Sequence, residues 1–82
     1  MKIKYFAWLK NITNKENEFV DDTNIKDIIS LKKYLIQQYP KLEEYLKKED
    51  YLRVAVNLKY TSSNKKLFKN DEIAIFPPVS GG

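Results

Sequence analysis

The sequence lacks cysteine and histidine entirely over its 82 residues. Their absence excludes disulfide bonds, thiolate nucleophiles, imidazole bases and the usual side-chain ligands of zinc and copper. Carboxylates remain available for acid–base chemistry, but no pair of them stands out among the dispersed charges, and we expect no metal site. A chain of this length forms one small domain that buries only about 60 to 65% of its unfolded surface. Size and composition therefore favour a carrier, adaptor or subunit over a self-contained enzyme.

Long apolar runs are also missing. No stretch approaches the roughly 20 apolar residues that are needed to cross a bilayer. Met1–Tyr5 alternates like a strand and does not have the apolar core of a cleavable signal peptide. We therefore expect a cytoplasmic protein with no membrane partner.

Arginine is nearly absent, because Arg53 is the only arginine among 15 basic residues. The formal net charge of +4 could indicate binding to nucleic acid. However, the lysines are spread along the chain and mixed with Asp and Glu, and arginine is the better bidentate ligand of bases and phosphates. We interpret the lysines as a solvated surface and expect no nucleic acid partner.

Glycine occurs only twice, as the terminal pair Gly81 and Gly82, and two of the three prolines, Pro77 and Pro78, stand shortly before it. Adjacent prolines favour an extended polyproline conformation, and glycine can enter a channel too narrow for a Cβ. The alternative is a frayed terminus without function, which the combination of a stiff spacer with a narrow tip disfavours. The tail therefore predicts a reactive C-terminal carboxylate, which becomes an electrophile once ATP adenylates it and a sulfur or amine nucleophile can displace the adenylate.

The body of the chain alternates between strand and helix patterns. In the first strand Ile3, Tyr5, Ala7 and Leu9 share one face, and Phe6 and Trp8 lie on the opposite face with two lysines. The short first loop predicts a hairpin. Strands are expected at residues 2–9, 18–20, 52–58, 60–61 and 72–76, and helices from about residue 22 to 38 and from 41 to 48.

The main helix is expected to begin at a cap among Asp22, Thr23 and Asn24, to carry Asp27 in its first turn and to stop at Pro40. Lys32 interrupts its apolar face, so either the lysine stem lies along the core or the helix starts one turn away. In the last turn Asn70 is expected at a positive φ in place of glycine. The predicted apolar face comprises Ile25, Ile28, Ile29, Leu31, Leu35, Ile36 and Tyr39.

Residues 70–82 end in Phe-Pro-Pro-Val-Ser-Gly-Gly, and this ending resembles that of the MoaD family, the small subunits of molybdopterin synthase. Residues 54–57, 28–40 and Phe6-Ala7 resemble the family as well, although only the ending is specific. Leu58 and Asn70 depart from it, because many members have a small residue and a glycine there. The resemblance implies an α+β domain of the ubiquitin-like β-grasp class, with a mixed sheet covered on one face by a helix, a globular body over 1–76 and a flexible Gly-Gly tail over 77–82.

The resemblance also implies a mechanism. An adenylyltransferase of the ubiquitin-activating type would adenylate the Gly82 carboxylate with ATP and Mg²⁺, and sulfur transfer would then make a C-terminal thiocarboxylate. The tail, with Gly81 at its tip and Pro77, Pro78, Val79 and Ser80 as its spacer, would enter the large synthase subunit and donate sulfur to cyclic pyranopterin monophosphate. The chain would hold no permanent cofactor and would not be catalytic alone. In the family the complex is a heterotetramer.

Exposed aromatic side chains on the sheet are candidates for the partner surface. Phe6, Tyr60 and Phe76 match positions at which the family contacts its large subunit. For Trp8, partner binding and cross-strand pairing remain equally open. Three alternatives to the synthase subunit also remain open, namely a sulfur carrier for thiamine synthesis, which usually lacks the Phe-Pro-Pro spacer, a conjugated ubiquitin-like modifier, and a basic binding module with an inert tail.

Overall fold

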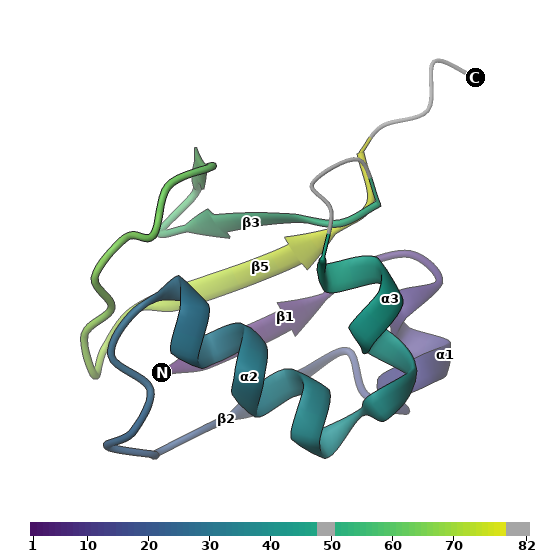
Figure 1. The fold of residues 1–82 in the computed structure, drawn as a ribbon, viewed down its shortest axis with the longest axis horizontal. Coiled ribbons are helices and arrows are strands. Elements are labelled where there is room, and N and C mark those ends of the chain that lie inside the picture. Colours follow the sequence, from purple (N-terminus) through teal and green to yellow (C-terminus); the bar gives the residue numbers. More distant parts are fainter. Residues whose placement is uncertain (48–50, 79–82) are drawn as a thin grey trace.

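The computed structural model describes residues 1–47 and 51–78, which form a five-stranded mixed sheet with helices on one face (Figure 1). The strand order is β2-β1-β5-β3-β4. The central pair β1 and β5 is parallel, and the other neighbours are antiparallel. The predicted sheet and covering helix are therefore confirmed. In chain order the elements are β1 (Lys2–Tyr5), α1 (Leu9–Thr13), β2 (Asn17–Phe19), α2 (Ile28–Gln38), the 3₁₀ helix η1 (Pro40–Leu42), α3 (Glu43–Leu46), β3 (Arg53–Val56), β4 (Lys59–Thr61) and β5 (Glu72–Phe76).

The core lies between the sheet and α2 because alternate strand residues are apolar. Ile3 pairs with Ile73 and Tyr5 with Ile75 across the parallel strands, and none of the four is more than 2% exposed. Val54 and Val56 extend this layer on β3, and Leu31 and Leu35 of α2 close it. In the described part of the chain no helix is long and apolar enough to cross a membrane.

The first strand is shorter than the sequence predicts. Ala7 adopts a φ of 57°, and this left-handed residue ends β1 and turns the chain into the short helix α1. Leu9 is buried as expected, but from a helix, whereas Ala7 is exposed, contrary to prediction. The connection to β2 is thus not a short loop, although β1 and β2 do pair antiparallel.

Helix α2 starts later than the sequence predicts, because Asp27 and not residues 22–24 is its N-cap. Asp27 Oδ1 accepts a 2.8 Å hydrogen bond from the Ser30 backbone N–H, and the Ser30 hydroxyl accepts one from the Asp27 N–H at 3.0 Å. The Ser30 backbone N–H and hydroxyl both donate to Asp27 Oδ1, which stabilises the carboxylate and lowers the pKa of Asp27. Ile29 is 52% exposed and does not belong to the buried face. Pro40 follows the end of the helix as predicted.

The loop before β5 explains the late start. The Ile28 and Ile29 N–H groups donate to the Lys65 carbonyl at 3.1 Å and to Asn64 Oδ1 at 2.9 Å. Both are first-turn donors that a helix cannot satisfy internally. Long-range contacts therefore select Asp27 over the earlier cap candidates.

Two turns differ in how they use positive φ. Asn57 and Leu58, at φ 51° and 71°, form the two-residue loop between β3 and β4, and the predicted return of the chain is confirmed. Asn70 does not have a positive φ, so that prediction was wrong. The Asp71 N–H donates to the Phe68 carbonyl at 3.1 Å and its carboxylate accepts from the Phe68 N–H at 2.8 Å, which closes the turn without a left-handed residue.

Candidate functional site

The C-terminal segment leaves the sheet from its central strand. β5 pairs on both sides, and its last residue, Phe76, lies opposite Arg53 at the beginning of β3. Pro77 and Pro78 follow immediately and cannot donate ladder hydrogen bonds. The predicted tail residues Val79, Ser80, Gly81 and Gly82 lie outside the described residues.

The three predicted interface residues lie on the sheet face opposite α2. Phe6 donates its N–H to the Ile75 carbonyl at 3.1 Å, so it continues β1 and points away from the buried Tyr5. Phe76 follows the buried Ile75 on β5 and therefore points to the other side of the sheet. Tyr60, on β4, lies opposite Ala55 of β3. Phe6 and Tyr60 are 46% and 49% exposed, and Phe76 is half-buried. We call this surface, which also carries the Lys2, Lys4, Arg53 and Glu72 side chains, the open face.

Trp8 does not belong to the open face. The left-handed Ala7 turns Trp8 out of the strand direction, and its ring centroid lies 4.9 Å from that of Tyr45 in α3. Tyr45 in turn contacts the Tyr51 ring edge-on at 6.3 Å. The structure therefore contradicts both the predicted position of Trp8 on the open face and its cross-strand pairing.

The cationic side chains of the open face have different kinds of partner. Lys4 Nζ lies 3.0 Å from Glu72 Oε1, and Lys2 Nζ lies 5.7 Å from the centre of the Phe19 ring. The Arg53 guanidinium lies 5.4 Å from the centre of the Tyr60 ring. The sequence did not indicate Arg53 as a site residue, and the available signal was that it is the only arginine. Its position beside Phe76 follows from the register of β3 and β5.

A partly buried polar cluster lies on the other side of the sheet, around Glu18 on β2. The Tyr5 and Tyr39 hydroxyls donate to Glu18 Oε2 at 2.5 and 2.6 Å, and Lys15 Nζ lies 3.4 Å from Oε1. Burial favours the neutral acid, but the hydrogen bonds from Tyr39 and Tyr5 outweigh it and lower the pKa of Glu18. Burial and the bond to Glu18 raise the pKa of Tyr5 far above its usual value. The cluster joins β1, β2 and the end of α2, and we assign it a structural role.

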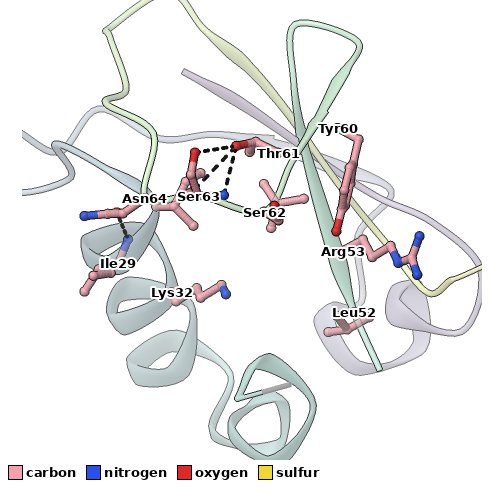
Figure 2. Close-up of a pocket in the computed structure, with 11 residues that line it drawn as sticks. Ile29, Lys32, Leu52, Arg53, Tyr60, Thr61, Ser62, Ser63 and Asn64 are labelled. Atoms are coloured by element: carbon pink, nitrogen blue, oxygen red, sulfur yellow. Dashed lines mark hydrogen bonds between the residues drawn. The ribbon is translucent and has the colours of Figure 1, made fainter. Parts of the chain in front are cut away.

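A groove of about 240 Å³ lies between α2 and the β3–β4 edge (Figure 2). Lys32 lies along it, which explains why a lysine interrupts the apolar face of the helix. Ser62, Ser63 and Asn64 also line it. The Ser63 hydroxyl lies 3.3 Å from that of Thr61, and the Asn64 side chain bonds to Ile29 and Asp27 at the start of α2. Arg53 and Tyr60 of the open face also line the groove where it reaches the β3–β4 edge.

A mixed five-stranded sheet packed on one helix, with the C-terminal segment leaving the central strand, defines the ubiquitin-like β-grasp class. The chain belongs to the ThiS family, which matches residues 3–82.

Relatives within this group are named for molybdopterin synthesis. The molybdopterin synthase sulfur carrier subunit of Dictyostelium discoideum is 37% identical, over 99% of this chain and 94% of that protein. The solved structure of putative molybdopterin converting factor subunit 1 from Pyrococcus furiosus superposes with a TM-score of 0.82 at 27% identity, covering 95% of both chains. These relatives confirm the resemblance to the MoaD family.

Two further solved structures bear on partners and alternatives. One is a complex of subunits 1 and 2 of molybdopterin-converting factor from Helicobacter pylori. The matching chain is 27% identical, with a TM-score of 0.68, and the match covers 99% of this chain and 96% of that chain. Small archaeal modifier protein 1 from Methanosarcina acetivorans is 26% identical, with a TM-score of 0.77 over 99% of this chain and 94% of that one. The same architecture therefore occurs in proteins named as synthase subunits and as modifiers.

Proposed function

We propose that this chain is the sulfur-carrier small subunit of molybdopterin synthase. The observation that supports this most strongly is the position of the Phe-Pro-Pro-Val-Ser-Gly-Gly ending, which starts at the last residue of the central strand and beside an aromatic face. The names of the full-length relatives point the same way.

The proposed chemistry takes place at the Gly82 carboxylate. A carboxylate oxygen attacks the α-phosphorus of ATP, and pyrophosphate leaves to give an acyl-adenylate. A sulfur nucleophile then attacks the carbonyl carbon and AMP leaves, which yields the thiocarboxylate. Transfer of this sulfur to cyclic pyranopterin monophosphate, with hydrolysis of the acyl group by water, regenerates the carboxylate.

The division of labour follows from what the chain contains. It has no histidine or cysteine to act as base or nucleophile, and the tyrosines around Glu18 are engaged in structural bonds. We therefore assign the use of ATP and Mg²⁺ to an adenylyltransferase of the ubiquitin-activating type. We assign the transfer of sulfur to cyclic pyranopterin monophosphate to the large synthase subunit. This chain supplies the reactive carbonyl and a surface for docking, and acts as the sulfur-donating part of a cytoplasmic sulfurtransferase.

The proposed docking surface is the open face at the end where the tail begins. Phe6 follows β1, Tyr60 lies on β4 and Phe76 ends β5, and aromatic side chains are enriched among residues that dominate binding energy. The tail of Pro77, Pro78, Val79, Ser80, Gly81 and Gly82 would enter the large subunit from this end, in a heterotetramer of two small and two large subunits.

A conjugated modifier is the second candidate, because a solved modifier shares both the fold and 26% of the sequence. A thiamine-type carrier is disfavoured by the Pro77-Pro78 spacer. Intact-mass measurement separates these functions after incubation of the chain with the activating enzyme, ATP and a sulfur source. Replacement of one oxygen by sulfur, followed by formation of molybdopterin with the large subunit, is the expected result. Larger adducts on lysine would support a modifier, and an unchanged mass would contradict both.

A further inference from the structure

Arg53 lies beside the point at which the proposed tail leaves the body. It is the first residue of β3, and its cross-strand partner is Phe76, the last residue of β5. Paired residues on antiparallel strands share a sheet face, so Arg53 points to the same side as Phe76. Its side chain is exposed, whereas the next residues of β3 are buried.

The Arg53 side chain is held by an aromatic ring. Its guanidinium carbon lies 5.4 Å from the centre of the Tyr60 ring, and Figure 2 shows the guanidinium beside that ring and pointing away from the groove under α2. A planar guanidinium over an aromatic face keeps its in-plane N–H donors available for a second ligand. The contact with the ring therefore restricts the position of a long side chain.

The charge of Arg53 is not neutralised within the described part of the chain. Lys4, on the same face, is paired with Glu72 at 3.0 Å. In residues 1–47 and 51–78, by contrast, Arg53 has neither an ion pair with a carboxylate nor a hydrogen bond from its guanidinium. A preordered cation with free N–H donors is suited to bidentate binding of a carboxylate.

We propose that Arg53 binds a carboxylate side chain of the large synthase subunit and so sets the specificity and orientation of docking. This rests on the function proposed above. A partner that receives Gly82 must cover the end of the open face where β5 stops, and covering Arg53 there removes water from its guanidinium. A buried guanidinium is costly unless a carboxylate replaces that water, so an acidic residue is the chemistry that fits.

The test is a titration of the large subunit with the full-length chain and its variants. Arg53→Ala should weaken binding by about 10-fold or more, and Arg53→Glu by about 100-fold or more, because a close charge pair is first lost and then reversed. Arg53→Lys should recover only part of the affinity, since lysine keeps the charge but not the planar fork. Lys33→Glu is the matched control, because Lys33 is exposed on α2, on the other side of the sheet, and makes the same change in net charge.

A charge exchange gives the decisive readout. Replacing the partner carboxylate of the large subunit by arginine should restore tight binding to Arg53→Glu and weaken binding to the unmodified chain. Thermal unfolding of each variant verifies that the fold is retained. If Arg53→Glu binds as well as Lys33→Glu while the unmodified chain binds tightly, this inference is wrong and the proposed function stands. If the unmodified chain neither binds the large subunit nor acquires sulfur, both fail.

Discussion

The side-chain amide of Asn57 donates a 2.9 Å hydrogen bond to Asp71 Oδ1. The Asn57 side-chain oxygen also accepts a hydrogen bond from the Glu72 N–H at 2.9 Å. The backbone N–H of Asn57 donates to the Glu72 carbonyl at 2.8 Å. The β3–β4 turn is therefore bonded to the start of β5, the strand that leads to the tail. This arrangement requires positive φ at both Asn57 and Leu58.

Leu58→Gly should stabilise the protein. Leu58 has a φ of 71° and is 90% exposed, so glycine removes left-handed strain and loses little packing. The gain should be about 0.5 to 1 kcal/mol in the free energy of unfolding, because glycine also adds entropy to the unfolded chain. Denaturant unfolding measures it. Lys59→Gly, one residue later inside β4, is the control and should destabilise; a similar effect at both positions would show that strain at Leu58 is not the cause.

Glu18→Gln should destabilise the protein at neutral pH and flatten its stability at acid pH. The lowered pKa of Glu18 means that the native state binds its proton less readily than the unfolded state. Its contribution is therefore present above the unfolded pKa of about 4.3 and is lost as the pH falls through the lower native pKa. The loss at pH 7 should be about 1 to 3 kcal/mol, because a charged acceptor with a side chain only 14% exposed is neutralised.

Unfolding by denaturant from pH 3 to pH 8 checks this expectation. Glu16→Gln provides the control, because Glu16 is two residues away and exposed. Parallel pH curves for the original chain and Glu18→Gln would show that the Glu18 cluster does not contribute to the acid dependence.

Phe76→Ala should weaken binding of the large subunit by on the order of 1 to 3 kcal/mol, the usual range for truncating a dominant aromatic residue. The physical reason is its position on the open face at the last residue of β5. Phe19→Ala is a matched control, since Phe19 lies opposite Lys2 at the other end of the same face and is 80% exposed. Calorimetric titration with unchanged affinity for Phe76→Ala, or an equal loss for Phe19→Ala, would remove Phe76 from the interface.

Adding one residue after Gly82, or deleting Gly82, should abolish thiocarboxylate formation and sulfur donation. The proposed reaction needs a carboxylate on a terminal glycine that fits a narrow channel, and the buried core is formed by residues between Ile3 and Ile75. Intact mass reports the modification and thermal unfolding reports the fold. A protease-cleavable extension that leaves Gly82 as the last residue after cleavage is the control, because cleavage should restore both steps. A permanently extended chain that still makes molybdopterin would contradict the mechanism.

The sequence by itself determined the elements whose residues repeat a simple pattern. Ile73 and Ile75 alternate because a strand with one buried face must place every second residue in the core. Pro40 marks the end of α2 because its ring and missing N–H oppose continuation of a helix. The ending Phe-Pro-Pro-Val-Ser-Gly-Gly indicated the family through its resemblance to a known ending, and its prolines and glycines predicted a reactive C-terminal carboxylate from local chemical properties.

The tertiary structure decided what depends on residues far apart in the chain. Local propensity allows several caps for α2, and the loop at Asn64 and Lys65 selects Asp27 by bonding the first turn. Trp8 leaves the open face because Ala7 turns left-handed, which places the indole against Tyr45. The register of β3 and β5 places Arg53 opposite Phe76, and the Tyr60 ring lies against its guanidinium. Such pairings depend on which distant segments pack together, because that packing offsets local preferences of about 1 kcal/mol per residue.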